Sequence, residues 1–177
     1  TVVQQSIAAR TLVRPGRAML FTAVATATTY KAKNAIDTFV SRGGEKLANA
    51  LEQLHVDPAG RDCLDVGSST GGFTDCLLQA GARRVIALDV GYGQLHPKLR
   101  DDPRVTVLER VNARRVTALP FAPELVVCDV SFISVRTALP PVLRLAAPGW
   151  EALVLVKPQF EAGRAEARKG VVRDPEV

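Results

Sequence analysis

The stretch Asp65-Val66-Gly67-Ser68-Ser69-Thr70-Gly71-Gly72-Phe73 decides the fold class, because it links an apolar run to a segment with helical periodicity. The apolar run at 63–66 predicts a strand. Phe73, Leu77 and Leu78 fall on one face of a helix expected over 72–80. Gly81 follows directly, and glycine is a common residue at the end of a helix. Strand, glycine loop and helix together predict the repeating unit of an α/β sheet.

Further apolar runs follow at 85–90, 105–108, 125–130 and 152–156. They are rich in valine and leucine without alternation, which is typical of strands covered on both faces. Helices are expected over 45–54 and 134–145, the second interrupted by Pro140-Pro141. Alternation of strands and helices predicts a mostly parallel sheet with right-handed crossovers.

The positive charge of the chain is confined to its beginning. The 177 residues contain 23 Lys and Arg against 18 Asp and Glu, a formal charge of +5. Residues 1–36 hold five basic and no acidic side chains, so that 18 of each remain from Asp37 onward. We interpret residues 1–38 as a basic leader or linker and residues 39–177 as one domain. An organelle transit peptide, or a signal-peptide core at 18–21, is the alternative for the leader.

Composition excludes several classes of protein. With 47% hydrophobic residues the chain can bury a core, which excludes wholesale disorder. The uncharged stretch 18–30 is shorter than the roughly 20 residues that cross a bilayer. Cys63, Cys76 and Cys128 lie in apolar runs, which predicts buried free thiols in a reducing compartment such as the cytoplasm. His55 and His96 are too isolated to indicate a zinc site.

Polar residues at the expected strand ends indicate a ligand site, since ligands of such sheets bind beyond the carboxyl ends of the strands. Asp89 lies 24 residues after Asp65, where a carboxylate can accept both hydroxyls of an adenosine ribose. Asn112 follows the next strand and can meet an adenine edge. The glycine spacing differs from dinucleotide and phosphate-binding loops, and Asp65 favours a cationic ligand group. The alternative is that the glycines serve only strand-to-helix packing.

Five segments in order carry a family resemblance. They are Val40-Ser41-Arg42-Gly43-Gly44-Glu45-Lys46-Leu47, the 65–73 loop, Asp89-Val90-Gly91-Tyr92-Gly93-Gln94-Leu95, Asp129-Val130-Ser131-Phe132-Ile133-Ser134 and Val156-Lys157-Pro158-Gln159-Phe160-Glu161. Over about residues 39–177 the chain resembles the TlyA family of hemolysin-named, FtsJ-like ribosomal RNA 2′-O-methyltransferases. The resemblance implies a Rossmann-like fold that uses S-adenosylmethionine to methylate the ribose 2′-hydroxyl of cytidines in ribosomal RNA or ribosomal subunits. It implies neither a membrane nor an obligate protein partner.

The resemblance also assigns residues. It implies catalytic roles for Lys46, Asp129 and Lys157, three members of a Lys-Asp-Lys-Glu tetrad. Cofactor contacts are expected from Asp65, Gly67, Ser69, Thr70, Gly71, Gly72, Phe73, Asp89, Val90, Asn112 and Ala113, and RNA contacts from Arg42, Arg114 and Arg164. Whether Lys157 accepts the hydroxyl proton or only orients the hydroxyl stays open. Each catalytic residue also has a structural alternative: Lys46 as a solvated helix residue, Asp129 as a helix cap and Lys157 as a strand-end cation.

The chain departs from the family at both ends. Family members carry an S4-type RNA-binding domain in place of residues 1–38. Their tetrad ends with a glutamate in later strands, and Glu161 stands in the wrong place for it. We therefore expect an impaired or inactive methyltransferase whose final parallel strand is left uncovered. A non-catalytic cofactor- or RNA-binding fragment is the alternative function, and a membrane-active hemolysin is disfavoured. Tyr92 and Phe132 are candidates for stacking on a base or for core packing.

Overall fold

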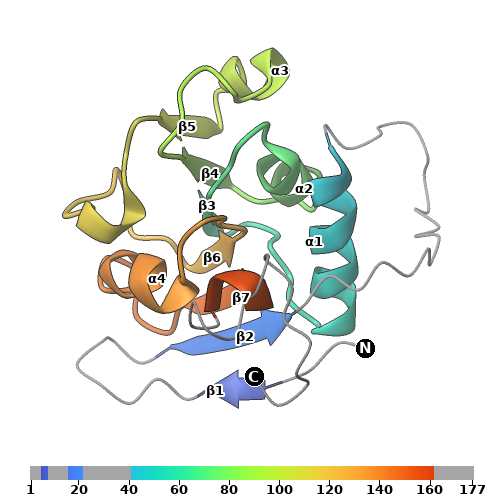
Figure 1. The fold of residues 1–177 in the computed structure, drawn as a ribbon. Helices are drawn as coiled ribbons and strands as arrows, with labels where there is room; N and C mark the ends of the chain where they lie inside the picture. The colour runs from blue at the N-terminus through green and yellow to red at the C-terminus, as the bar shows by residue number, and fades with distance from the viewer. Residues whose placement is uncertain (1–4, 8–15, 22–40, 162–177) are drawn as a thin grey trace.

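A seven-stranded sheet forms the centre of the computed structural model, which describes residues 5–7, 16–21 and 41–161 (Figure 1). The strand order is β1-β2-β7-β6-β3-β4-β5. The strands are β1 (Gln5–Ile7), β2 (Arg17–Phe21), β3 (Asp62–Val66), β4 (Arg84–Leu88), β5 (Val105–Leu108), β6 (Leu125–Cys128) and β7 (Glu151–Leu155). All neighbouring strands pair in parallel except β1 and β2.

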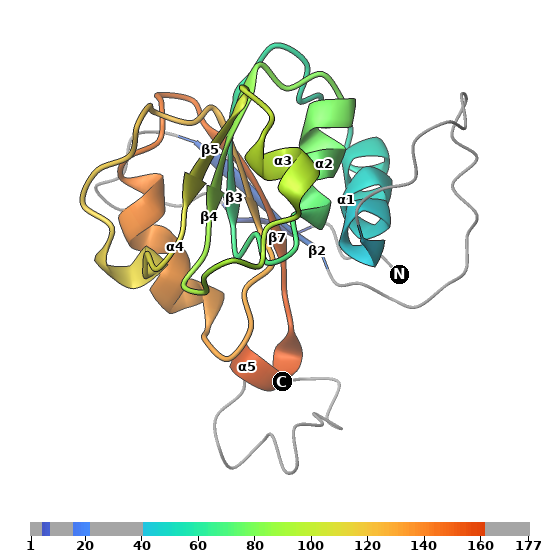
Figure 2. The same ribbon diagram turned by 90° about the horizontal axis from the view of Figure 1, so that it is seen from above.

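Helices cover both faces of the sheet and give a three-layer α/β/α architecture (Figure 2). One face is covered by α1 (Arg42–Gln53), α2 (Gly72–Gln79) and α3 (Pro97–Arg100), and the other by α4 (Val135–Leu143) with the 3-10 helix η1 (Ala113–Arg115). The short helix α5 (Pro158–Glu161) lies beyond the end of β7. Because both faces are covered, the central strands β3, β4, β6 and β7 bury nearly every side chain, and β3 is buried along its whole length. The predicted Rossmann-like fold is confirmed.

The register of the central strands brings the loops of interest together. Val66, the last residue of β3, pairs with Leu88 on one side and with Cys128 on the other. These three residues each end a strand. The residues that follow them, Gly67, Asp89 and Asp129, therefore emerge side by side at one edge of the sheet.

Most of the predicted elements are present, with shifted ends. The second and fourth predicted strands stop at Leu88 and Cys128, two residues early. The chain turns at Asp89, whose carboxylate accepts a hydrogen bond from the Gly91 amide. Helix α1 starts three residues earlier than predicted because Ser41 caps it and accepts from the Gly43 amide.

Helix α4 runs to Leu143 through Pro140 and Pro141, although an interruption was expected there. The two prolines remove hydrogen bonds to Arg136 and Thr137, one turn earlier in the helix. Both of those residues are exposed, so water can hydrate their carbonyl groups.

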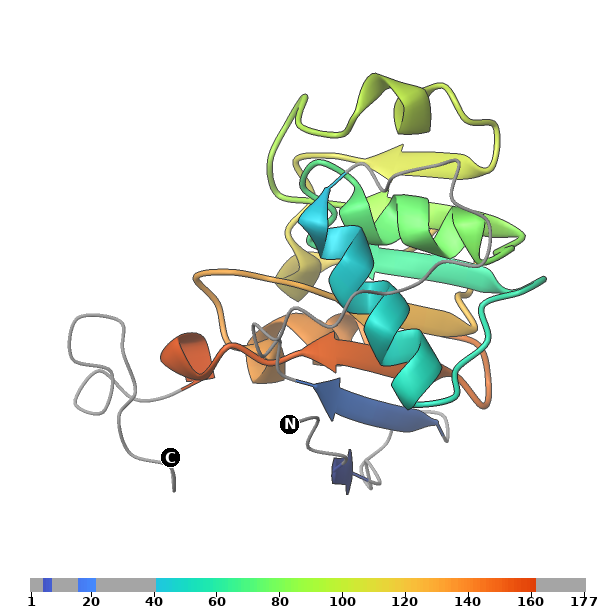
Figure 3. The same ribbon diagram turned by 90° about the vertical axis from the view of Figure 1, so that its right-hand side faces the viewer.

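The expectation of an uncovered final strand is wrong. Strand β2 pairs in parallel with β7 along its whole length, and the Val156 amide also donates to the Phe21 carbonyl at 2.8 Å (Figure 3). Met19 and Phe21 are each 4% exposed and join the core beneath α1. The apolar residues 18–21, considered above as a signal-peptide core, thus belong to the sheet. The sequence carries no clear signal for this strand, because residues 18–21 are all apolar and do not alternate with polar residues.

The three cysteines are buried and free, as predicted. Burial raises the pKa of each thiol, Cys63, Cys76 and Cys128, to about 12. Such thiols stay protonated at neutral pH and behave as small apolar core residues.

Candidate active site

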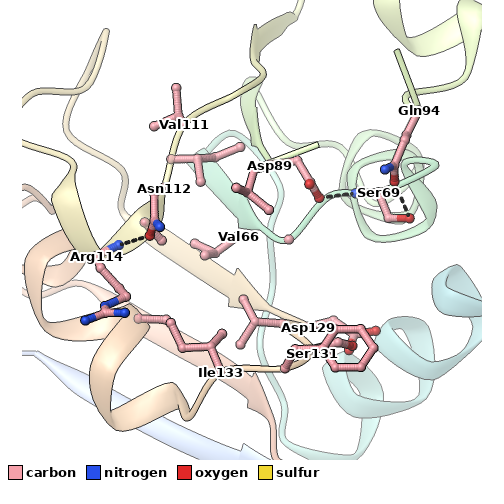
Figure 4. Close-up of a pocket in the computed structure, with 17 residues that line it drawn as sticks. Val66, Ser69, Asp89, Gln94, Val111, Asn112, Arg114, Asp129, Ser131 and Ile133 are labelled. Atoms are coloured by element: carbon pink, nitrogen blue, oxygen red, sulfur yellow. Dashed lines mark hydrogen bonds between the residues drawn. The ribbon is translucent and has the colours of Figure 1, made fainter. Parts of the chain in front are cut away.

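Two adjoining cavities lie at the carboxyl ends of β3, β4, β6 and β7. The first, of about 560 Å³, is bounded by the loops after β3, β4, β5 and β6 (Figure 4). The second, of about 250 Å³, lies between the start of α1, the β3–α2 loop and the ends of β6 and β7. Gly67, Ser69, Asp129 and Ser131 line both cavities. A ligand in one cavity is therefore in reach of a ligand in the other.

Two glycines of the β3–α2 loop are required for different structural reasons. Gly67 has a φ of +87°, and a Cβ there would lie 2.9 Å from the Asp129 carbonyl oxygen. A side chain would thus push apart the two loops that form the floor of both cavities. Gly71 has a φ of +100°, and its Cβ would lie 2.2 Å from Leu99 Cδ1. Gly71 lines neither cavity. Its role is therefore close packing against Leu99 rather than the predicted contact with a cofactor.

Asp89 is held in one orientation by backbone amides. Its Oδ2 accepts a hydrogen bond from Ser69 N at 2.8 Å, and its Oδ1 accepts one from Gly91 N at 2.7 Å. The carboxylate lines the first cavity between β4 and the glycine loop. Each carboxylate oxygen can accept a further hydrogen bond. Asp89 is therefore an oriented acceptor for two neighbouring hydroxyl groups.

The opposite wall of the first cavity comes from the loop after β5. Asn112 Oδ1 accepts a hydrogen bond from Arg114 N at 3.0 Å, which caps η1 and leaves the side-chain amide hydrogens for a ligand. Ala113 and Arg114 line the cavity beside it, and Val90 stands at its rim with 69% of its surface exposed. This side of the cavity therefore offers both an apolar surface and free amide hydrogens to a ligand.

Asp65 was expected to contact the cofactor, but it lines neither cavity. Its Oδ2 accepts a hydrogen bond from the Thr74 hydroxyl at 2.7 Å, and its Oδ1 is buried without a hydrogen-bond partner in the described part of the chain. Burial raises the pKa of Asp65 to about 7, and the contacts with Thr74 offset only part of this rise. Asp65 lies on the same face of β3 as Cys63, which α2 covers, so its carboxyl group is buried against Thr74.

The three predicted catalytic residues meet in the second cavity. Lys157 Nζ lies 2.5 Å from Asp129 Oδ1, in an ion pair that is not a directed hydrogen bond, and donates to Ser131 Oγ at 2.7 Å. Lys46 lines the same cavity from α1. Two lysines and one carboxylate thus surround a space that opens to the first cavity. Asp129 caps no helix, because Ser134 caps α4.

The remaining predicted residues divide between the cavities. Thr70, Gly72 and Phe73 line the second cavity rather than the first, and Phe73 is largely part of the core at 4% exposed. Arg42 is exposed on α1 and lines neither cavity. Arg164 lies outside the described residues.

Sequence reasoning missed Ser131 and Gln94 as site residues, and left Phe132 open between stacking and packing. Ser131 follows Asp129 by two residues at a strand end, which was the signal for it. Phe132 has a φ of +64° and is 91% exposed, so it is not a core residue. The Tyr92 ring lies beneath the Arg110 guanidinium, 4.1 Å from its centroid. Gln94 accepts a hydrogen bond from Ser69 at 3.4 Å.

No group of three or more histidine, cysteine or acidic side chains that could hold a metal ion occurs among the described residues. None of the helices that the structure describes is long and apolar enough to cross a membrane.

The fold is that of a Rossmann-like α/β domain, with two adjoining cavities at the carboxyl ends of its strands. A family model described as FtsJ-like methyltransferase matches residues 39–177, and the chain belongs to that family.

Individual relatives agree with this assignment. The chain is 53% identical over 142 residues to the 16S/23S rRNA (cytidine-2′-O)-methyltransferase TlyA of Mycobacterium tuberculosis, an alignment that covers 78% of this chain and 53% of TlyA. It is 47% identical to Hemolysin A of Brachyspira hyodysenteriae, over 77% of this chain and 58% of that protein. A hemolysin-named structure from Streptococcus thermophilus superposes with a TM-score of 0.75 at 42% identity, over 80% of this chain and 53% of that one. The chain thus spans about half the length of the curated relatives that it matches.

Proposed function

We propose that this domain transfers a methyl group from S-adenosylmethionine to the ribose 2′-hydroxyl of a cytidine in ribosomal RNA, with S-adenosylhomocysteine as the leaving group and the hydroxyl proton released to water. The observation that carries the proposal is the ion pair of Lys157 with Asp129 in the second cavity. This cavity adjoins the first one, which is large enough for an adenosine, and four residues line both. Methyl transfer between two bound molecules needs such adjoining spaces, because the acceptor oxygen and the donor must meet in line.

The residues of the first cavity fit S-adenosylmethionine. A volume of about 560 Å³ is within the usual range for small-molecule sites. Asp89 would accept the ribose hydroxyls of the cofactor, while Asn112 and Ala113 would meet its adenine edge, with Val90 at the rim. Gly67 and Ser69 would contact the part that enters the second cavity. When bound, S-adenosylmethionine supplies an electrophilic methyl group.

The residues of the second cavity would handle the acceptor hydroxyl. A protonated lysine has three donors, and Lys157 directs its ammonium group at Asp129 and Ser131. Ser131 accepts one of these hydrogens and Asp129 attracts the ammonium group in an ion pair, so a hydrogen is left for the ribose oxygen. This hydrogen bond would orient the lone pair of that oxygen for attack. This arrangement supports an orienting role for Lys157, because a proton acceptor would first have to lose its own proton. Lys46 adds a second positive charge beside the same space.

The substrate class comes from the relatives. TlyA of Mycobacterium tuberculosis is named for cytidine 2′-O-methylation of 16S and 23S ribosomal RNA. We extend this substrate class to the chain and infer that it works on ribosomal subunits in the cytoplasm. Arg114, at the wall of the first cavity, is the described candidate for a phosphate contact, with Arg42 on α1 as a second one. Arg100 and Arg104 are weaker candidates because they pair with Glu109 and Asp102.

Calorimetry with S-adenosylmethionine tests the cofactor site. We expect Asp89→Ala to weaken binding by about 30-fold, since it removes an oriented acceptor worth about 2 kcal/mol. Asp101→Ala, which removes an exposed carboxylate near α3, is the matched control and should bind like the unmodified chain. Equal binding by both variants would contradict the assignment of Asp89.

Transfer of a radiolabelled methyl group to ribosomal subunits in a single turnover tests the reaction. The impaired activity expected above remains a prediction, so the rate is measured with the chain in excess over RNA. Label on cytidine ribose that disappears with Lys157→Ala supports the proposal. Cofactor binding without any transfer would instead favour the alternative function, a fragment that binds cofactor or RNA without catalysis. The presence of Lys46, Asp129 and Lys157 does not decide between these two functions.

A further inference from the structure

Beyond the second cavity, the chain after Lys157 folds back onto the loop that follows Asp129. Three contacts join these segments, and together we call them the clasp: Lys157 with Ser131, Phe160 with Phe132, and Glu161 with Ser134 and Val135. The first contact belongs to the proposed catalytic cavity, and the other two lie outside it. Figure 2 shows α5 beyond the end of β7, close to the loop that leads into α4.

Glu161 uses both carboxylate oxygens in the clasp. Its Oε2 accepts from Ser134 Oγ at 2.6 Å, and its Oε1 accepts from Val135 N at 2.8 Å. Val135 is the first residue of α4, and the first amides of a helix have no partner within it. A carboxylate at this end also interacts favourably with the helix dipole. Glu161 is therefore tied to the start of α4 rather than directed at the substrate.

The loop that Glu161 holds contains a backbone conformation that needs support. Phe132 has a φ of +64°, which is uncommon for a residue with a side chain and persists only where its surroundings maintain it. Its ring is 91% exposed, so burial does not maintain the conformation. The Phe160 ring lies 5.2 Å from it, centroid to centroid, and Glu161 fixes the end of the same loop. Between these supports and Asp129 stands Ser131, the hydrogen-bond acceptor for Lys157.

We propose that Glu161 is a positioning residue for Lys157. By tying α5 to the start of α4, it holds Ser131 Oγ in place and so keeps the Lys157 ammonium group directed into the second cavity. The importance of this position for turnover rests on the proposed function. The restraint on Lys157 itself can be measured without any turnover.

Competitive labelling of amines measures that restraint. The full chain is treated with a limiting amount of acetic anhydride, and acetylation of Lys157, Lys46 and Lys98 is quantified by peptide mass spectrometry. In Glu161→Ala we expect Lys157 to react 5- to 10-fold faster, with the other two lysines unchanged, because the ammonium group loses its fixed acceptor. Glu161→Gln should stay within 2-fold, since its amide oxygen can still accept from Val135. Glu52→Ala, which removes an exposed carboxylate of α1, is the control.

Methyl transfer provides the second measurement. At saturating RNA, Glu161→Ala should slow single-turnover transfer by 10- to 50-fold while the Kd for S-adenosylmethionine changes less than 3-fold, and Glu161→Gln should restore most of the rate. If the unmodified chain transfers no methyl group but Glu161→Ala still exposes Lys157, the proposed function fails and the role of Glu161 stands.

An unchanged Lys157 in folded Glu161→Ala overturns the proposal. Equal acceleration at all three lysines also overturns it, because that pattern reports general loosening of the fold. If Glu161→Ala does not fold, Phe160→Ala replaces it. This variant removes a different contact of the clasp, and we expect a 2- to 4-fold faster reaction of Lys157 alone. No acceleration in Phe160→Ala then counts against the positioning role.

Discussion

The two ends of β3 place two aspartates in opposite environments. Asp62, at the amino end, accepts hydrogen bonds from Arg83 and Arg84 at 2.7–2.9 Å. Its hydrogen bond with Arg84 is the largest influence on its pKa, which lies well below the usual range even though the side chain is buried. Asp65, three residues later, is fully buried, and its Oδ1 has no hydrogen-bond partner among the described residues. Burial raises its pKa to about 7.

The same contrast extends across the sheet. At the amino end, the Glu151 carboxylate forms ion pairs with Arg17 and Arg61, so these charges are neutralised by their neighbours. At the carboxyl end, Asp129 and Lys157 pair with each other but still line a cavity. Charges that neutralise one another contribute to stability, whereas charges facing a cavity remain available to a ligand. The amino edge of the sheet therefore carries charges that pair with one another, and its carboxyl edge carries the charges that line the proposed active site.

The largest expected effect compares one aspartate from each end. Asp129→Asn should slow single-turnover methyl transfer by about 10³-fold, or about 4 kcal/mol, because Lys157 loses the charge that positions it. Asp62→Asn should leave the rate of the folded protein within about 2-fold. Equal losses in the two variants would break the proposed separation of roles.

Asp65 gives the next largest effect, which depends on pH. Its pKa of about 7 in the folded chain exceeds the unfolded value of about 3.9, so the folded state holds the extra proton between these values. Its contribution to stability is complete below about pH 4 and is lost as pH rises to about 7. Asp65→Asn lacks this titration, and its stability relative to the unmodified chain should rise by about 4 kcal/mol over that interval.

Urea unfolding of both proteins at several pH values measures this difference. Thr74→Ser, which keeps the hydroxyl donor to Asp65, serves as a control and should retain the pH dependence. A constant difference in stability between Asp65→Asn and the unmodified chain from pH 4 to 8 would show that Asp65 ionises normally.

A third prediction concerns β2, the strand outside the family match. Phe21→Ala should lower the free energy of unfolding by about 3 kcal/mol, because Phe21 is 4% exposed in the core beneath α1. Arg17→Ala, at the exposed start of the same strand, should cost less than about 1 kcal/mol. A small effect of Phe21→Ala in urea unfolding would show that this edge of the sheet contributes little to stability.

The smallest effect is the loss of stability in Asp62→Asn. We expect about 1–2 kcal/mol near neutral pH, since solvent screens the two partly exposed arginines that it pairs with. Because the pKa of Asp62 is lowered by folding, its contribution is present above about pH 4 and disappears as pH falls further. Thermal unfolding of the two proteins should therefore converge in acid.

Local sequence signals were sufficient for the elements and for part of the site. Valine-rich runs predicted β3 to β7 because strands buried on both faces need apolar residues throughout. Asp89 and Asn112 were predicted as ligand residues because ligands of a parallel sheet bind beyond the carboxyl ends of its strands. Asp129 was predicted from the family resemblance. The exceptions were contacts between distant segments: Ser131 meets Lys157 across 26 positions, and β2 meets β7 across more than 130.

By itself, the sequence determined the order of β3 to β7 and of α1, α2 and α4 along the chain, the loops between them and the family, because these depend on periodicity and local motifs. Tertiary structure alone decided which residues of those motifs face a cavity. Gly71 packs against Leu99, Asp65 is buried beneath the loop, and Ser131 joins Lys157. It also decided that part of a basic leading segment becomes a strand of the sheet. The physical reason is that burial and long-range pairing set the environment of a side chain, and neither is encoded in its immediate neighbours.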